Sequence, residues 1–117
     1  MNFNLTTEET KGILIVHLSG EVNPGNEDLF QLELEKVFSQ ASLKKTNIIL
    51  SFRELEYINS TGLGVITHFY RRCNEASLKV MICSLNRMCT RLFEITKMNQ
   101  IFEISSSLDK ATAELEQ

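Results

Sequence analysis

The sequence predicts an α/β fold, with a mixed, mostly parallel sheet and helices packed against it. Apolar runs of strand length, such as residues 13–18 and 47–52, alternate along the chain with segments of helical periodicity. Strands that alternate with helices pair in parallel through right-handed crossovers. The predicted order of elements is therefore β-β-α-β-α-β-α-β-α.

Length and composition indicate a single globular domain. The chain has 117 residues, of which 43% are apolar, so it can bury a sizeable core. Its formal net charge of −3 argues against direct binding to nucleic acid. The N-terminal residues lack the basic start and apolar block of a signal peptide, and no apolar run has the length of a membrane span. We expect one domain over residues 1–117, in the cytoplasm and without membrane insertion.

The cysteines do not form a metal-binding or disulfide pattern. Cys73, Cys83 and Cys89 are odd in number and have no C-x-x-C spacing. We expect reduced thiols in a cytosolic protein, where they act as small apolar residues. His17 and His68 have no zinc-like spacing to the cysteines or to each other. We therefore expect no metal site and no cofactor.

The first part of the chain is expected to form two strands and a helix. Residues 3–7 predict a weak strand, and residues 8–12 a turn. Residues 13–18 are apolar on nearly both faces, as suits a strand that is covered on both sides. Asn26 is expected to be the N-cap of the first helix, because two acidic residues follow it. The apolar face of this helix is expected to contain Phe30, Leu34, Val37, Phe38 and Ala41, widened by Leu29 and Leu32.

The remaining elements alternate in the same way. Strands are expected at residues 47–52, 78–83 and 101–104. Helices are expected at about residues 61–76 and 87–96, and Ser107 is expected to cap a final helix. The predicted apolar faces are Val65, Phe69, Cys73 and Ala76 in the first of these, Met88, Leu92 and Ile95 in the second, and Leu108, Ala111, Thr112 and Leu115 in the third.

Three loops are predicted to gather at one edge of the sheet. They leave the carboxyl ends of the parallel strands at residues 20–26, 55–62 and 84–86. In open α/β sheets this edge is where ligands and partners bind. The middle loop contains Ser60 at the point where a helix begins. We expect Ser60 to be exposed and flanked by the other two loops.

Ser60 fits two roles. As an N-cap, its hydroxyl would accept a hydrogen bond from a backbone N–H of the first turn. If Asn59 or Thr61 caps instead, Ser60 is free to be phosphorylated, which adds about −1.5 to −2 charges at a surface edge. Gly62 and Gly64 also fit two roles, because a glycine in a helix allows either close packing on the sheet or a flat surface for a partner.

The residues around Ser60 do not resemble an active site. Ser60 lacks the G-x-S-x-G elbow of serine hydrolases. His68 lies more than a turn inside the predicted helix, and His17 lies within a predicted core strand. Paired carboxylates are missing from the predicted edge. An enzyme therefore ranks below a binding module, and we expect no catalytic residues.

Three segments of the chain resemble the STAS domain family, and in particular the bacterial anti-sigma factor antagonists. Residues 59–66, NSTGLGVI, are similar to the family motif D-S-[ST/A]-G-L-G before a helix. Residues 18–23, LSGEVN, resemble the family turn G-E-[LIV]-D, and residues 91–95 with 101–102 give a third, weaker match. The similarity covers almost the whole chain and implies a single STAS domain over residues 1–117.

The resemblance implies a regulatory module that acts on transcription through a protein partner. That partner would be an anti-sigma factor with serine kinase activity, which phosphorylates Ser60 and so ends the binding, while a serine phosphatase reverses the modification. Asn59 and Asn23 depart from the family, because they stand where it has acidic residues. An amide can form hydrogen bonds but supplies no charge. The alternative is a STAS subunit that does not switch, in a stress-signalling scaffold or a lipid-transport complex.

The helix expected at residues 87–96 adds a further candidate contact. Arg87 and Arg91 lie one turn apart on its expected outer side, where they form a solvated face or contact a partner. Phe93 is either partly exposed beside them, as an anchor for that partner, or absorbed by the core. The predicted phosphorylation site is Ser60. The predicted partner-binding residues are Glu21, Asn23, Asn59, Ser60, Thr61, Gly62, Gly64, Ser84, Arg87 and Arg91.

Overall fold

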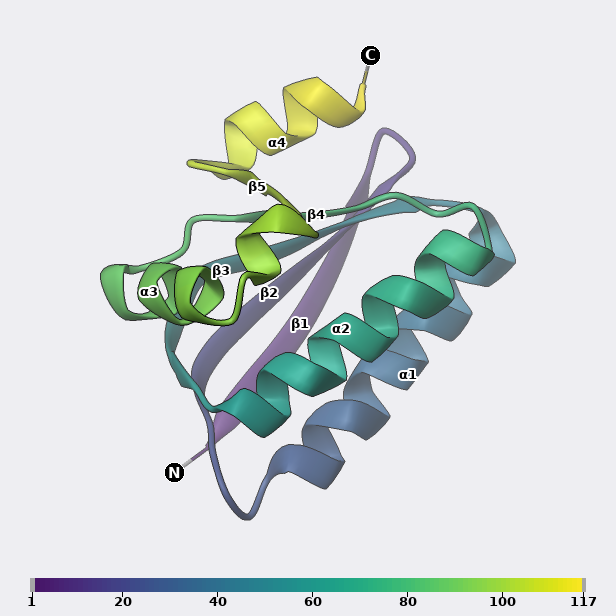
Figure 1. Ribbon diagram of the computed structural model, residues 1–117. Helices are drawn as coiled ribbons and strands as arrows, with labels where there is room; N and C mark the ends of the chain where they lie inside the picture. The colour runs from purple at the N-terminus through teal and green to yellow at the C-terminus, as the bar shows by residue number, and fades with distance from the viewer. Residues whose placement is uncertain (1, 117) are drawn as a thin grey trace.

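The computed structural model describes residues 2–116, which form a five-stranded mixed sheet with helices on both faces (Figure 1). β1 (Phe3–Thr10) and β2 (Ile13–Val22) pair as an antiparallel hairpin. β3 (Asn47–Ile58), β4 (Val80–Cys83) and β5 (Glu103–Ser105) continue the sheet in parallel, in the order β1-β2-β3-β4-β5. The predicted fold class and the predicted order of elements are confirmed.

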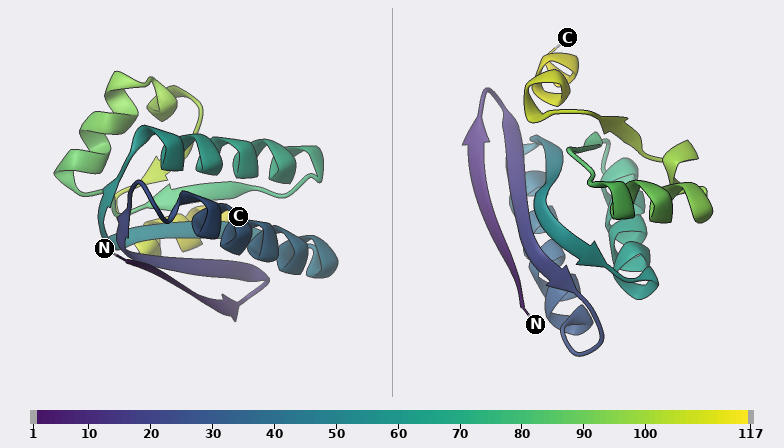
Figure 2. Two further views of the ribbon diagram at one scale, coloured as in Figure 1. Left: turned by 90° about the horizontal axis from the view of Figure 1, so that it is seen from below. Right: turned by 90° about the vertical axis from the view of Figure 1, so that its left-hand side faces the viewer.

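The helices form two layers around the sheet. α1 (Glu27–Lys44) and α2 (Ser60–Glu75) lie side by side on one face, as the views in Figure 1 and Figure 2 show. α4 (Leu108–Leu115) covers part of the opposite face. α3 (Arg87–Ile95) follows β4, and a short 3-10 helix, η1 (Met98–Gln100), leads from α3 to β5. None of the helices formed by residues 2–116 combines the length and the apolar character that a bilayer span requires.

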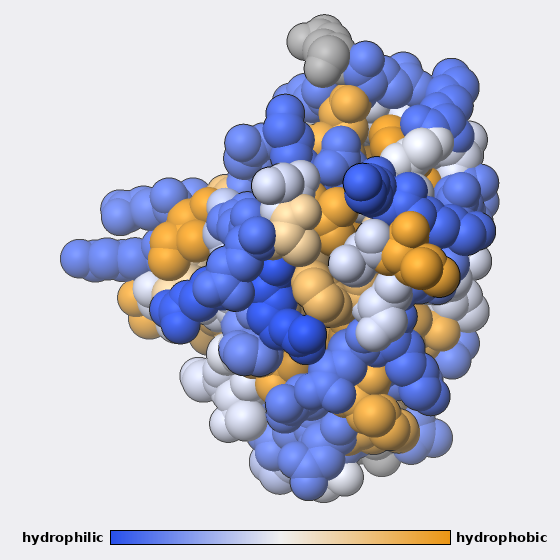
Figure 3. Space-filling model, turned by 90° about the vertical axis from the view of Figure 1, so that its right-hand side faces the viewer, coloured by the Kyte–Doolittle hydropathy of each residue, from blue (hydrophilic) through white to orange (hydrophobic). Residues whose placement is uncertain are grey.

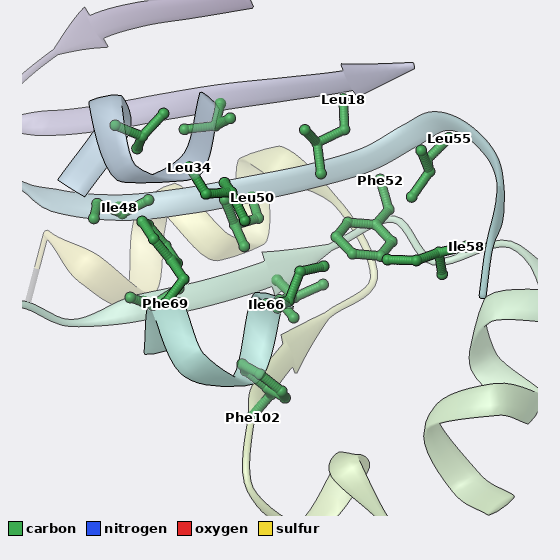
Figure 4. Close-up of a cluster of buried hydrophobic side chains, with 14 of the residues drawn as sticks. Leu18, Leu34, Ile48, Leu50, Phe52, Leu55, Ile58, Ile66, Phe69 and Phe102 are labelled. Atoms are coloured by element: carbon green, nitrogen blue, oxygen red, sulfur yellow. The ribbon is translucent and has the colours of Figure 1, made fainter. Parts of the chain in front are cut away.

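The main core lies between the sheet and the pair α1 and α2. In Figure 4, Leu34 of α1 and Phe69 of α2 point toward the side chains of β3, among them Leu50. A smaller cluster on the other face includes Ile15 and Ile49, which pack under Ala111 of α4. Because both faces are covered, residues 13–16 of β2 are all buried, as the apolar run predicted.

Three strands are longer than the sequence predicted. β1 continues to Thr10, β2 to Val22 and β3 to Ile58. The charged residues after Phe52 resemble a loop, but the parallel ladder between β2 and β3 resumes after register shifts and pairs Val22 with Ile58. Leu55 and Ile58 are then buried at 1% and 2% exposure. The predicted loop at residues 55–62 is therefore strand up to Ile58 and helix from Ser60, and only Asn59 separates β3 from α2.

The predicted inner face of α3 is wrong at Met88 and Ile95, whereas Leu92 is partly buried against the core. Met88 and Ile95 were expected inside, but they are 43% and 73% exposed. The buried residues of α3 are Cys89 and Phe93, which are one turn apart. The ring of Phe93 packs edge-on against Phe52 of β3 at a centroid distance of 5.9 Å, so the face of α3 that carries Phe93 and Cys89 lies against the core.

Some apolar side chains of the helices stay at the surface. Leu29 and Leu32 were expected to widen the apolar face of α1, but they are 53% and 48% exposed because the core contacts only the stripe around Leu34. Ala76, expected in the inner stripe of α2, is exposed just beyond the end of that helix. On the side of the molecule shown in Figure 3, hydrophobic residues form separate small patches among hydrophilic ones. Scattered exposed apolar residues of this kind are normal for a globular domain.

Candidate functional site

Ser60 is exposed and is the first residue of α2. Asn59 is the N-cap: its backbone is extended, at φ −87° and ψ 175°, and its Oδ1 accepts a hydrogen bond from the Gly62 N–H at 2.8 Å. The Ser60 hydroxyl forms no hydrogen bond to any of residues 2–116. Of the two roles that fit Ser60, the capping role is therefore taken by its neighbour.

The start of α2 favours negative charge beside Ser60. The first turn of α2 contains no acidic residue. The aligned peptide dipoles and the unpaired N–H groups of a helix start together stabilise an anion placed there. A phosphate carried by Ser60 would thus extend from the positive end of α2.

The turn after β2 lies beside the start of α2. The Asn59 N–H donates to the carbonyl oxygen of Val22 at 3.1 Å, which joins the end of β2 to the end of β3. The Asn59 side chain reaches the first turn of α1, where its Nδ2 donates to Glu27 Oε2 at 2.7 Å. The predicted proximity of residues 20–26 to Ser60 is therefore confirmed. Glu27 also lies beside this site, although no sequence motif pointed to it.

Asn26 is the N-cap residue of α1, as predicted, but its side chain forms hydrogen bonds within the preceding turn and none to the first turn of α1. Its Oδ1 accepts from the Asn23 N–H at 3.0 Å, and its Nδ2 donates to the carbonyl oxygen of Glu21 at 2.9 Å. Its side chain forms no capping hydrogen bond to α1. The amide is engaged by the turn that precedes the helix, so it fixes the shape of the loop that adjoins Ser60.

Ser84, in the third predicted loop at residues 84–86, does not lie beside Ser60 as expected. Ser84 follows Cys83, which pairs with Ser51, whereas β3 continues to Ile58. Residues 52–58 span roughly 20 Å of strand, so Ser84 lies well short of Ser60 along the sheet. Ser84 instead lines a cavity of about 530 Å³ on the α4 face, together with Ser51 and Ser107. Its predicted role in partner binding gains no support from this position.

Asn86 is the residue of that loop which approaches β3. Its Oδ1 accepts from the Cys89 N–H at 2.8 Å and so caps α3. Its Nδ2 donates to the carbonyl oxygens of Leu55 at 3.1 Å and Glu56 at 3.3 Å. The same amide therefore positions α3 against the extended part of β3.

The two glycines of α2 have different surroundings. Gly62 is buried, and a Cβ there would lie 2.7 Å from Val22 Cγ1 and 2.8 Å from Ile58 Cγ1. Gly64 is exposed, and a Cβ there would meet nothing within 4 Å. Close packing therefore accounts for Gly62, and the predicted flat surface is present only at Gly64. Gly64 lies one turn after Ser60, on the same face of α2.

Neither histidine lies beside Ser60. His68 is exposed on the Ser60 face of α2, but two helical turns, about 12 Å, separate the two residues. The Nε2 of His17 lies 2.8 Å from Glu8 Oε1 across the β1–β2 hairpin. Within residues 2–116, no group of three or more His, Cys, Asp and Glu side chains is placed to hold a metal ion.

Arg87 and Arg91 are exposed on the outer side of α3, as expected. Of the two alternatives for Phe93, partial exposure beside the arginines or burial in the core, the structure shows burial, at 0% exposure. The Phe93 ring is held between the rings of Phe52 and Phe102, so it is no aromatic anchor for a partner. The apolar side chains exposed next to the two arginines are those of Met88 and Ile95. The buried face of α3, Cys89 and Phe93, is thus shifted by one residue from the predicted face, which held Met88 and Leu92.

The buried cysteines should be chemically inert in the folded protein. Burial raises the pKa of Cys73 to about 12, with a smaller opposing effect of the Arg72 charge, and raises that of Cys89 to about 11. Both thiols should therefore stay protonated and fail to react with a thiol reagent at about pH 8 until the chain unfolds. Rapid labelling of the native protein, followed by mass spectrometry, would contradict this expectation.

The same thiols imply a fall in stability under alkaline conditions. An unfolded cysteine ionises near pH 9.0, whereas these thiols keep their protons to about 11 and 12 when folded. Above pH 9.0 the unfolded chain thus binds fewer protons than the folded one, and the free energy of unfolding decreases as the pH rises further. Denaturant titrations on both sides of pH 9.0 measure this decrease.

Comparisons with known proteins agree with the motifs around Ser60. Residues 4–111 match the model of the STAS domain family. The chain is 29% identical over 116 residues to the anti-sigma F factor antagonist of Paenibacillus polymyxa, covering 99% of this chain and 97% of that relative. An anti-sigma factor antagonist from Mycobacterium paratuberculosis shares the fold with a TM-score of 0.86 at 15% identity, covering 99% of this chain and 96% of that one. The phosphorylated form of the Bacillus protein SpoIIAA shares it with a TM-score of 0.68 at 15% identity, covering 96% of this chain and 99% of that one. The chain therefore belongs to the STAS domain family.

Proposed function

We propose that this protein is an anti-sigma factor antagonist, which binds an anti-sigma factor with serine kinase activity and is switched off by phosphorylation of Ser60. Binding would use the surface formed by Glu21, Asn23, Asn59, Ser60, Thr61 and Gly64, called here the Ser60 surface. The antagonist acts on transcription indirectly, in the cytoplasm, because the captured anti-sigma factor releases its sigma factor. The relatives named anti-sigma factor antagonists support this function.

The observation that carries the proposal is the free hydroxyl of Ser60. A kinase needs a serine that is exposed and whose oxygen is not engaged within its own protein. Asn59 takes the capping position, so Ser60 meets both conditions while it stays at the rigid start of a helix. SpoIIAA, which shares this fold, has been solved in unphosphorylated and phosphorylated forms.

The chemistry of the switch follows from this placement. The kinase transfers the γ-phosphoryl group of ATP to Ser60 Oγ, which leaves ADP and releases the hydroxyl proton. A serine phosphatase then hydrolyses the phosphoserine with water to serine and inorganic phosphate. Because the kinase must bring nucleotide phosphates up to Ser60, a phosphate already on Ser60 would face like charges, a juxtaposition that costs several kcal/mol in a protein interface. The modified antagonist should therefore dissociate.

Incubation with a cognate anti-sigma kinase and ATP should place one phosphate on Ser60. Intact-mass measurement followed by peptide mapping identifies the position. Ser39→Ala is the matched control, because it removes an exposed serine hydroxyl of α1 outside the Ser60 surface and should leave the labelling unchanged. Ser60→Ala should abolish it. A phosphate on another residue, or none with an active kinase, refutes the proposed switch.

Binding measurements provide the second arm of this test. Ser60→Asp should weaken binding to the anti-sigma factor by about tenfold or more, which corresponds to roughly 1.4 kcal/mol. Ser60→Ala should bind like the wild type. Ser39→Asp, which adds the same charge at an exposed serine of α1, should also bind like the wild type. Equal loss of affinity in Ser39→Asp and Ser60→Asp would show a general charge effect instead of a local one.

A second candidate is a STAS subunit that does not switch, in a stress-signalling scaffold or a lipid-transport complex. Asn23 and Asn59 favour it, because both replace acidic residues of the family motifs with neutral amides. Such a subunit should copurify with its partner and retain the same affinity in Ser60→Asp. The binding series above therefore distinguishes the two candidates.

A further inference from the structure

Glu27 contacts the residue that precedes the candidate phosphorylation site. Its carboxylate Oε2 accepts a hydrogen bond from Asn59 Nδ2 at 2.7 Å, although the two residues lie 32 positions apart in the chain. At that length a hydrogen bond to an ionised acceptor belongs to the stronger class. The other end of the same amide caps α2 through the Gly62 N–H. Asn59 thus links the Glu27 carboxylate to the helix start that carries Ser60.

No basic side chain of residues 2–116 neutralises the negative charge of Glu27. Glu27 is half-buried and forms no ion pair with a Lys, Arg or His side chain of residues 2–116. On the other side of the surface, the Glu21 carboxylate has a longer contact of 3.4 Å to Asn23 Nδ2 and likewise lacks a basic partner among the described residues. Each amide that replaces an acidic residue of the family motifs therefore touches a carboxylate from a neighbouring position.

The pairing explains why an amide suits position 59 in this chain. An aspartate there would place a second carboxylate against Glu27, with no proton to share between the oxygens at neutral pH. Like charges in direct contact are costly, and the hydrogen bond at 2.7 Å would be lost. With asparagine at position 59, Glu27 and Asn59 together carry a single negative charge. The Asn59 amide keeps both its hydrogen bond to Glu27 and its hydrogen bond from the Gly62 N–H.

We propose that Glu27 is a specificity-determining residue of the Ser60 surface, which supplies the negative charge that Asn59 lacks and binds a cationic side chain of the partner. This inference rests on the proposed function, because it assigns a contact in the same complex. Asn59 holds the carboxylate in place, and the partner provides the lysine or arginine that the described part of this chain does not. An uncompensated charge at a protein interface mainly determines specificity and the rate of association.

A purely structural role for Glu27 makes different predictions. An acidic residue in the first turn of a helix stabilises that helix through the macrodipole, whether or not it contacts a partner. Asp28 is the matched control, since it is acidic, exposed and in the same first turn of α1. Glu27→Gln and Asp28→Asn each remove one charge from that turn. A dipole effect should change thermal stability similarly in both and leave partner binding unchanged.

The test is a charge swap measured by binding to the anti-sigma factor at low and moderate salt. Glu27→Gln should weaken binding at least fivefold, and the salt dependence of the affinity should become shallower, because a screened charge pair is lost. Asn59→Asp should lower the melting temperature of the free protein. The double variant Glu27→Gln with Asn59→Asp restores one charge and one amide, and it should return the affinity to within about twofold of the wild type. Asp28→Asn should bind like the wild type.

Each outcome decides the inference. If wild type and Glu27→Gln bind the anti-sigma factor equally well, with the same salt dependence, the role of Glu27 is overturned but the proposed function is not. A double variant that stays as weak as Glu27→Gln shows that the position of the charge is not transferable, which also overturns it. A wild type that neither binds an anti-sigma factor nor accepts phosphate overturns both. Melting curves of every variant separate a loss of binding from a loss of folding.

Discussion

Gly62→Ala should lower the free energy of unfolding by about 1–3 kcal/mol, although alanine is the better helix former. The added methyl group would lie 2.7 Å from Val22 Cγ1 and 2.8 Å from Ile58 Cγ1. Valine is stiff at χ1, and both neighbours are buried where β2 and β3 end, so neither can move without disturbing the core. Urea unfolding followed by circular dichroism measures the change.

Gly64→Ala is the matched control on the same helix. Its Cβ would meet nothing within 4 Å, so only the helix propensity of the two residues differs. The free energy of unfolding should rise by about 0.5–1 kcal/mol. Changes of opposite sign in the free energy of unfolding would show that Gly62 is required for packing and Gly64 is not. A stabilised Gly62→Ala would mean that α2 packs less closely on the sheet than the structure indicates.

Phe93→Ala should cost about 3–5 kcal/mol of stability, the range found when a buried aromatic side chain is removed. Phe93 is 0% exposed and joins α3 to the core through ring contacts with Phe52 at 5.9 Å and Phe102 at 5.8 Å. Its removal would leave a cavity that the surrounding strand and helix fill only in part. Denaturant unfolding should show a lower midpoint, and α3 should exchange its amide hydrogens faster.

Ile95→Ala is the control for this prediction. Ile95 is two residues further along α3 and 73% exposed, so its truncation should change stability by no more than about 0.5 kcal/mol. The sequence pattern, which placed Ile95 on the inner face, predicts a substantial loss of stability for Ile95→Ala. Equal losses from Phe93→Ala and Ile95→Ala would contradict the orientation of α3 described here.

The boundaries of β2 and β3 show where prediction from the sequence failed. Arg53, Glu54 and Glu56 are polar, and local patterns ended the strand before them, at Phe52. The strand continues because register shifts in β2 allow Val22 to pair with Ile58 and bury it. A ladder between segments some 36 residues apart leaves no local signal when its residues are charged on the exposed side. The same limit explains why Ser84 was placed with Ser60.

The amino-acid sequence alone determined the fold class, the order of the elements and the position of Ser60 at the start of a helix. These features depend on apolar periodicity and on a contiguous motif, which are readable within a window of a few residues. Only the tertiary structure decided that Asn59 caps α2 while holding Glu27, that Gly62 packs against Val22, and that Phe93 faces inward. These contacts arise because the parallel pairing of β2 with β3 and the docking of α1 beside α2 bring together residues distant in the chain, and the free energy of such contacts is set by three-dimensional packing.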